Sequence, residues 1–149
     1  IRAGLIKGCL NRKVKKEEIT MSLNLDNTNQ AYLCGRLFAV LEKIQQDASG
    51  GNLNRTIKDS YFSSACSKPA TVFPKLIQLS QNHLKKVEYV LFYQKLCGDI
   101  IDQLEDAFPS TLSLDEQGKF IIGYYQQNKA LYAKKEKQQE TATDDSVAE

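Results

Sequence analysis

The sequence has very few of the residues that usually build metal or catalytic sites. It contains one histidine, His83, no tryptophan, and four cysteines of which no two have CxxC spacing. A structural zinc site needs His and Cys ligands at close spacing. The sequence also has no GxSxG, Walker or HExxH motif and no Cys–His pair at an informative spacing. We therefore predict a protein that is not an enzyme and has no metal or cofactor.

Long apolar runs are missing as well. No stretch approaches the roughly 18 residues that a membrane-spanning helix requires. Residues 1–13 carry charges on both sides of a very short apolar patch, which is unlike a signal peptide. The cysteines lie among apolar neighbours, as reduced thiols in a protein core do. The sequence thus predicts a soluble, cytoplasmic protein, and 149 residues suffice for one domain with a sizeable core.

Proline is scarce, with only three in the chain, and apolar residues recur at helical spacing along most of its length. No segment requires a strand. The pattern predicts an all-α fold, a compact bundle of about five helices with a disordered C-terminal tail. The expected helices span residues 27–49, 53–66, 72–87, 88–108 and 113–137.

Local signals predict where these helices begin and end. Asp26 or Asn27 can cap the first helix, and Gly50 and Gly51 can end it. Pro74 is tolerated only in the first turn of a helix, so the third helix is expected to begin near residue 72.

The last helix begins with a capping box, in which Ser113 and Glu116 satisfy each other's backbone amides. Gly118 and Gly123 weaken this helix unless they allow a neighbouring helix to approach closely. The apolar residues expected to face inward along it are Leu114, Ile121, Tyr124, Tyr125, Leu131 and Tyr132.

The domain organisation follows from composition. Residues 1–20 resemble the end of a helix and a charged linker ahead of Met21, the only methionine. Residues 21–137 form the helical bundle. Residues 138–149 contain four acidic residues and no Lys or Arg, and we expect them to be a disordered acidic tail.

Charge is distributed unevenly along the bundle. Residues 51–87 hold six Lys or Arg and one acid, Asp59, so 6 − 1 = +5, whereas residues 88–118 hold Lys95 and seven acids, so 1 − 7 = −6. This asymmetry favours a basic face for a phosphate backbone and an acidic face for neighbouring protein. A merely solvated surface is the alternative. The candidate nucleic-acid-binding residues are Arg36, Arg55, Lys58, Lys68, Lys75, Lys85 and Lys86.

Two of the charged positions fall on the first expected helix. Arg36 lies near its apolar edge and is a candidate for an interface, whereas Lys43 is expected on a solvated outer face. His83 has no evident Cys or Asp partner, which favours a structural role. The carboxylates of the helix at 88–108 would need ligands from other elements to hold a cation. An enzymatic role for these residues is the remotest alternative.

Three segments of the chain resemble a known family. YLCGRLFAVLEKIQQDA (32–48), NRTIKDSYFSSACSKPATVFPKLIQLSQNHLKK (54–86) and LSLDEQGKFIIGYYQQNK (112–129) are similar to the C-terminal region of the large subunit of the type I-C CRISPR interference complex, Cascade. The similarity is collinear over roughly residues 20–130. In this family the same gene region is thought also to yield a separate small subunit by internal initiation, and Met21 lies where such an initiation would fall. The chain therefore resembles the small subunit with some sequence upstream of Met21.

The resemblance implies a non-catalytic helical subunit that lines the complex and stabilises the opened DNA strands, the R-loop, through sequence-neutral contacts. The implied partners are the CRISPR RNA-containing complex (large subunit, backbone subunits and further copies of this chain) and target DNA, but neither a membrane nor a small-molecule substrate. Ser60 and Gln126 depart from the family pattern, in which Arg and His are frequent at these positions, so no contact is assigned to them. The alternative function is a structural spacer that only bridges neighbouring protein subunits.

Overall fold

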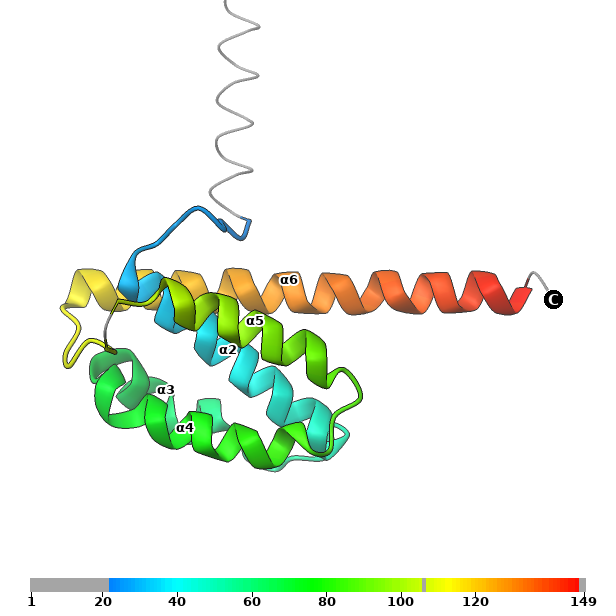
Figure 1. Ribbon diagram of the computed structural model, residues 1–149, viewed down its shortest axis with the longest axis horizontal. Coiled ribbons are helices and arrows are strands. Elements are labelled where there is room, and N and C mark those ends of the chain that lie inside the picture. The colour runs from blue at the N-terminus through cyan, green and yellow to red at the C-terminus, as the bar shows by residue number, and fades with distance from the viewer. Residues whose placement is uncertain (1–21, 106, 148–149) are drawn as a thin grey trace, which may run out of the picture.

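The computed structural model describes residues 22–105 and 107–147, and side chains up to residue 133. The expected partial helix and linker at residues 1–20 lie outside this range. The described part of the chain contains five helices and no strand, which confirms the all-α prediction (Figure 1). None of these helices is both long and apolar enough to cross a membrane. The helices are α2 (Gln30–Ser49), α3 (Ile57–Ser67), α4 (Pro69–Leu84), α5 (Val90–Gln103) and α6 (Leu114–Val147).

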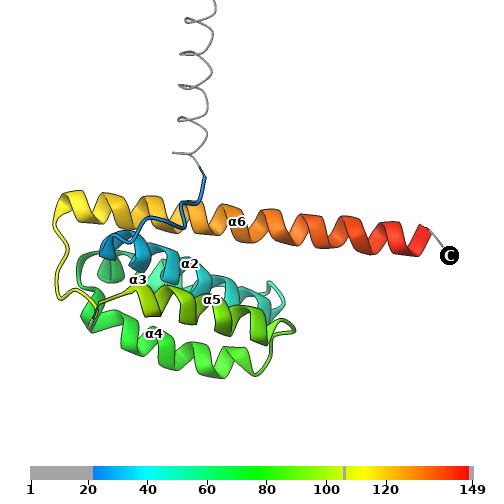
Figure 2. The same cartoon turned by 45° about the horizontal axis from the view of Figure 1, so that its top comes forward.

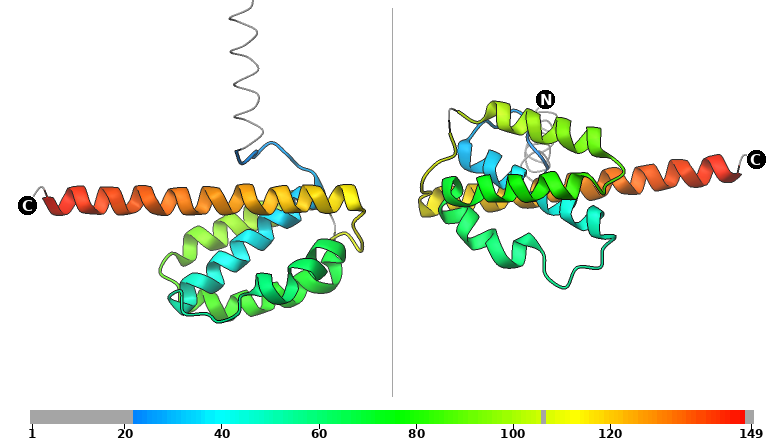
Figure 3. Two further views of the ribbon diagram at one scale, coloured as in Figure 1. Left: turned by 180° about the vertical axis from the view of Figure 1, so that it is seen from behind. Right: turned by 60° about the horizontal axis from the view of Figure 1, so that its bottom comes forward.

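Helix α2 is the centre of the bundle. Every residue from Ala31 to Ile44 is buried, because α3, α4, α5 and α6 all pack against this helix (Figures 1 and 2). In the view from behind, α6 lies across α2 (Figure 3, left). The Phe38 ring forms the middle of the core and lies 5.4 Å from the Phe62 ring and 5.9 Å from the Tyr124 ring. Aromatic rings at such distances bury a large apolar area in one cluster.

The ends of α2 agree with the sequence signals at one end only. The side chain of Asn29 caps the helix by accepting hydrogen bonds from the amides of Ala31 (3.1 Å) and Tyr32 (3.2 Å). The predicted cap Asn27 instead accepts the amide of Asn29 in a turn ahead of the helix. Gly50 ends the helix with a positive φ of 68°, as predicted, since glycine adopts this conformation without a steric penalty.

Helix α4 begins three residues earlier than expected. Pro69, rather than Val72, is its first residue, where a missing amide hydrogen is harmless and the fixed φ suits a helix. Pro74 therefore lies inside the helix and not in its first turn. Lys68 alone separates α3 from α4, and these two helices pack against each other.

Helix α5 is shorter than the predicted span 88–108. It ends at Gln103, and the following chain folds back over the start of α4, where the carbonyl of Pro109 accepts the amide of Ala70 at 3.0 Å. This path stacks the ring of Phe108 on that of Phe73, with centroids 5.0 Å apart. The turn needed for this packing ends the helix before Pro109 does.

Two glycines set the distance between α2 and α6. A Cβ atom on Gly123 would lie 2.3 Å from the carbonyl oxygen of Tyr32, and one on Gly35 would lie 1.9 Å from that of Phe120. Gly123 thus allows the close helix approach that the sequence left open. Gly118 does not, since nothing lies within 4 Å of its Cβ position.

The inward face of α6 was predicted only in part. Tyr124 and Leu131 are buried as expected, and Phe120 and Gln127 are buried beside them. Leu114, Ile121, Tyr125 and Tyr132 were expected inside, but 84%, 39%, 54% and 40% of their surfaces are exposed. The apolar residues of this helix extend around more of its surface than α2 and α3 cover, and periodicity alone does not show which part is covered.

Helix α6 is also longer than expected. Its backbone is helical to Val147, and its C-terminal half extends beyond the bundle (Figure 1). The helix therefore includes residues 138–147, for which composition predicts disorder. Between Gly123 and Val147 there is neither proline nor glycine, and Lys, Gln, Glu and Ala are good helix formers, so no local signal ends the helix there.

Candidate nucleic-acid interface

The exposed cations of the segment from Arg55 to Lys86 form the candidate site. Helix α3 starts with a capping box between Thr56 and Asp59, and the amide of Ile57 donates to the side chain of Gln45 on α2 (2.8 Å), which attaches the start of α3 to the core. Helix α4 buries Phe73 and Leu76, and so turns its opposite side to solvent. We call the five exposed cations the basic surface: Arg55, Lys68, Lys75, Lys85 and Lys86.

Among the side chains that the structure describes, no carboxylate forms an ion pair with the basic surface. Within the described part of the chain the one ion pair joins Lys43 to Asp47 at 3.1 Å. Asp59, the only acid among residues 51–87, is held by its capping box, in which its Oδ2 accepts the amide of Thr56 at 2.9 Å. Lys75 lies on α4, and Lys85 and Lys86 form the turn directly after its last residue, Leu84. The five charges are therefore exposed and have no carboxylate partner within residues 22–105 and 107–133.

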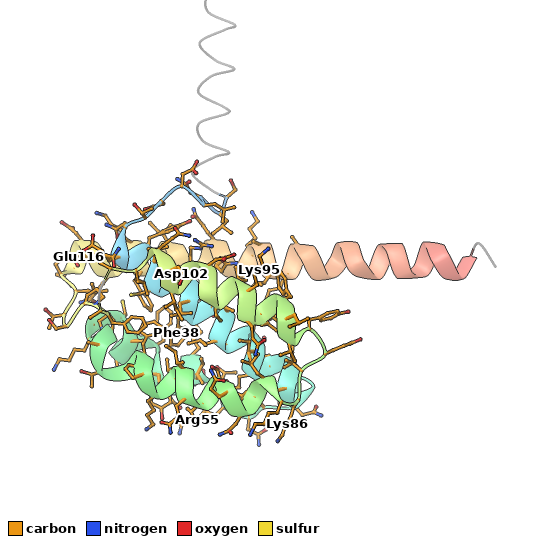
Figure 4. All side chains as sticks on the ribbon, viewed as in Figure 1. Phe38, Arg55, Lys86, Lys95, Asp102 and Glu116 are labelled. Atoms are coloured by element: carbon orange, nitrogen blue, oxygen red, sulfur yellow. The ribbon has the colours of Figure 1, made fainter. Side chains whose placement is uncertain are left out.

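Two residues of the basic surface lie apart from two of the acidic residues. Arg55 and Lys86 lie along the lower edge in Figure 4, whereas Asp102 lies on α5 and Glu116 at the start of α6, both in the upper half. Asp99, Asp102 and Glu105 are all exposed. The remaining predicted acid of this group, Asp106, is outside the described residues. For these four labelled residues the charge asymmetry along the chain is thus also an asymmetry in space.

One residue of the basic surface contacts an aromatic ring. The Lys75 ammonium lies 5.2 Å from the centre of the Tyr61 ring, a cation–π distance that joins α4 to α3. Tyr61 is half-buried. The contact orients the lysine across the outside of the helix pair.

Lys58, another of the predicted nucleic-acid-binding residues, is half-buried and therefore is not counted in the basic surface, whose members are all exposed. Its ammonium lies 4.9 Å from the centre of the Tyr124 ring, 5.0 Å from that of Tyr125 and 5.6 Å from that of Phe62, and it donates a hydrogen bond to the Tyr125 hydroxyl at 3.4 Å. The first turn of α3 faces α6 at this point. Lys58 is therefore half-buried and joins these two helices.

Arg36 is also misplaced by the sequence prediction. Only 2% of its surface is exposed, so it cannot reach a phosphate in this fold. Its Nε donates to Oε1 of Gln127 on α6 at 2.9 Å, while Nη1 has no partner within the described residues. Burial lowers the pKa of Arg36, an effect that Tyr32 and Asp99 oppose. Arg36 is a structural cation between α2 and α6.

Other polar groups at the same helix pair are buried, which sequence reasoning missed. Lys43 was expected in solvent but is only 5% exposed, and its ammonium lies 4.6 Å from the centre of the Tyr132 ring. Glu42 is equally buried; its Oε1 accepts the Tyr124 hydroxyl at 2.8 Å, and its Oε2 has no hydrogen-bond partner in the part of the chain that the structure describes. Burial raises the pKa of Glu42, while the hydrogen bond from Tyr124 and the charge of Lys58 act against this rise.

The structure brings no group of catalytic type together in the part of the chain that it describes. His83 is half-buried, and burial and Lys86 lower its pKa. Burial raises the thiol pKa of both Cys34 and Cys97 to about 12, so neither forms a thiolate readily at neutral pH. No three His, Cys, Asp or Glu side chains in these residues could hold a metal ion.

Comparison with known proteins identifies the family. No curated protein matches this chain. Residues 1–132 match the CRISPR-associated protein (Cas_Csd1) family. The match covers most of the 149 residues, including helices α2 to α5 and the first half of α6. The chain therefore belongs to the CRISPR-associated protein (Cas_Csd1) family.

Proposed function

We propose that this chain is a non-catalytic small subunit of the type I-C Cascade complex and that its basic surface holds the opened DNA strands of the R-loop. Family membership supports a place among CRISPR-associated proteins. The proposal assigns no reaction to the chain. In RNA-guided complexes, base pairing with the guide RNA reads the target sequence, and protein contacts to the nucleic-acid backbone stabilise the opened DNA.

One observation carries the proposal: the basic surface has five exposed cations, none of them ion-paired with a carboxylate of the described side chains. Exposed cations of this kind bind phosphates and release counterions from the nucleic acid, so affinity falls as salt is raised. Paired cations would first have to break their ion pairs. The exposed hydroxyls of Ser63 and Ser64 on α3, which lies between Arg55 and Lys68 in the chain, add neutral donors.

Salt dependence tests the contact directly. We expect the logarithm of the binding constant for target DNA to fall linearly with the logarithm of salt concentration. Changing Lys75 or Lys86 to Gln should make the slope shallower by about 0.7 to 0.9 for each phosphate contact removed. Fluorescence anisotropy with the assembled complex measures this slope. A slope that none of the five cations changes would contradict the proposal.

Reconstitution tests the role in strand opening. A complex lacking this subunit is restored with wild-type chain, with a Lys75→Glu/Lys86→Glu variant, or with a Lys95→Glu/Lys119→Glu control. The control changes the net charge equally at two exposed lysines outside the basic surface. Size-exclusion chromatography measures incorporation, and permanganate footprinting measures opened DNA. We expect both variants to incorporate and only the first to lose the opened duplex.

The second candidate function is the structural spacer, which the exposed surface of α5 favours. Leu91 is 81% exposed and Ile101 38% exposed, beside the acidic residues Asp99 and Asp102. Exposed apolar residues with a charged rim are typical of protein interfaces. If the Lys75→Glu/Lys86→Glu variant opens DNA as well as the wild type, the spacer is the better account.

A further inference from the structure

The outer side of α5 is not covered by any helix that the structure describes. Helix α5 packs against α2, and no other helix lies over it in Figure 1. Leu91, Gly98 and Asp102 are spaced by seven and four residues and so share one side of the helix, which Ile101 borders. Leu91 is 81% and Ile101 38% exposed, and a Cβ atom on Gly98 would meet nothing within 4 Å. We call these four residues the α5 face.

The surroundings of the α5 face are acidic. Residues 88–105 contain four acids and one lysine, all exposed, so 1 − 4 = −3. None of these charges forms an ion pair with another described side chain. Asp102 lies in the last turn of α5, where the negative end of the helix dipole disfavours a carboxylate. The α5 face therefore fits a partner that combines apolar residues with positive charge.

Residues 1–20 of the same chain have this composition. They contain six Lys or Arg and two Glu, so 6 − 2 = +4. Their apolar residues include Leu5, Ile6, Cys9 and Leu10, which recur at the spacing of one side of a helix. The charges of this segment and of residues 88–105 are opposite in sign and nearly equal in size. The chain thus carries both a face and a segment complementary to it.

The described part of the chain begins close to α5. The amide of Asn24 donates to the hydroxyl of Tyr32 at 3.0 Å, which holds the residues ahead of α2 beside its first turn. At the same turn the side chain of Gln30 accepts the amide of Glu105, just after α5, at 3.0 Å. Helix α5 has 14 residues and is about 21 Å long. Residues 11–21 can extend over about 35 Å, so residues 1–10 can reach along the α5 face.

We propose that residues 1–20 bind the α5 face of their own chain. Their apolar residues contact Leu91 and Ile101 on either side of Gly98, and their Lys and Arg pair with Asp102 and Glu105. The basic surface contributes no residue to this contact, so the inference does not depend on the proposed function. The structural spacer would instead place another subunit on the α5 face, and the experiment distinguishes the two occupants.

Carbodiimide crosslinking of the full chain, mapped by mass spectrometry, tests the contact because the reagent joins a lysine only to a carboxylate that touches it. Each yield is divided by the coupling of the same acid to a small free amine, which corrects for reactivity. Bonds from residues 1–20 to Asp102 and Glu105 should form in about tenfold higher yield than bonds to Asp115, since binding raises the local concentration of the lysines. Asp115 is an exposed acid on α6 and serves as the control.

Two results of this experiment would overturn the proposal. Equal yields at Asp102, Glu105 and Asp115 would show that residues 1–20 have no preferred position. Bonds that form only between chains, which a mixture of isotope-labelled and unlabelled chain reveals, would show that the segment does not bind its own chain.

Substitutions test the apolar part of the contact. Leu91→Gln/Ile101→Gln should lower the yield at Asp102 about tenfold because it removes apolar area from the contact. Ile122→Gln changes a similarly exposed residue of α6 and should leave the yield unchanged. Circular dichroism melts confirm that the variants fold. An unchanged yield in the first variant would overturn the proposal, as would an assembled complex in which Asp102 crosslinks to another subunit and never to residues 1–20.

Discussion

Replacing Gly123 by alanine should destabilise the protein, although alanine is the better helix former. The substitution alone improves helix propensity by about 1 kcal/mol. The new Cβ, however, would lie 2.3 Å from the carbonyl oxygen of Tyr32, which is backbone and cannot rotate away. The two helices must separate by on the order of 1 Å, and packed cores resist such shifts at a cost of roughly 3–4 kcal/mol when contacts along the whole crossing are loosened. The net loss of unfolding free energy is about 2–3 kcal/mol.

Gly118 provides the matched control on the same helix. Nothing lies within 4 Å of its Cβ position, so Gly118→Ala should stabilise the chain by about 0.5–1 kcal/mol through propensity alone. The two variants should thus differ by about 3 kcal/mol, or roughly 10 °C in Tm for a domain of this size. Urea denaturation followed by circular dichroism at 222 nm (the helical signal) measures both.

Gly35→Ala extends the experiment to the other helix of the crossing. Its Cβ would lie 1.9 Å from the carbonyl oxygen of Phe120, so its cost should equal or exceed that of Gly123→Ala. The double variant should lose less than the sum, because the first alanine already separates the helices that the second would separate. The reasoning would be refuted if Gly123→Ala were as stable as Gly118→Ala.

Three further predictions concern buried polar groups. Gln127→Leu should lower the free energy of unfolding by about 2–4 kcal/mol, because it removes the hydrogen-bond acceptor of the buried Arg36. The double variant Arg36→Met/Gln127→Leu should recover most of this loss in urea denaturation. A double variant as unstable as the single one would contradict this prediction. The folded pKa of Glu42 is raised above its ordinary 4.5, so the folded state holds this proton longer and Glu42 reduces stability as pH rises from about 4.5 through the raised pKa. Glu42→Gln should flatten that decline, and an unchanged slope of stability against pH would argue against burial as its cause. Cys34 and Cys97, with pKa values of about 12, should react with a thiol reagent at neutral pH far more slowly in the folded than in the urea-unfolded chain. Equal rates in the two states would show that burial does not protect them.

Signals that act within a few residues were predicted correctly. Half of the predicted capping box is present: the Ser113 hydroxyl accepts the amide of Glu116 at 3.3 Å, and the Glu116 carboxylate accepts the Ser113 hydroxyl at 3.2 Å. Gly50 ends α2. These features depend on local backbone geometry, which neighbouring residues determine. The Asn29 cap was missed because Asp26, Asn27 and Asn29 can all cap a helix, and only packing against the rest of the bundle selects the first helical residue.

Site residues were harder to predict because their roles depend on other helices. Arg55, Lys75 and Lys86 are exposed as expected, since no apolar periodicity draws them inward. Lys58 has the same residue type and a similar sequence context, yet it lies against three aromatic rings, two of them on α6. A helix partner more than sixty residues away in sequence leaves no local signal at Lys58. The only indication of this contact in the sequence was the pair of neighbouring tyrosines, Tyr124 and Tyr125, on another expected helix.

The sequence by itself determined an all-α chain, the sites of several helix ends, and a concentration of positive charge between residues 51 and 87 opposed by acid after it. These properties follow from composition and from periodicities that each helix carries alone. Only the tertiary structure decided which charges face solvent. Helix α2 is covered on all sides, so Arg36 and Lys43 are buried, whereas α6 is covered on one side, so several of its apolar residues remain exposed. The physical reason is that the burial of a residue depends on how many other helices pack around its own helix. Close crossings such as the one at Gly35 and Gly123 join helices that are far apart in sequence, so a local stretch of sequence does not show them.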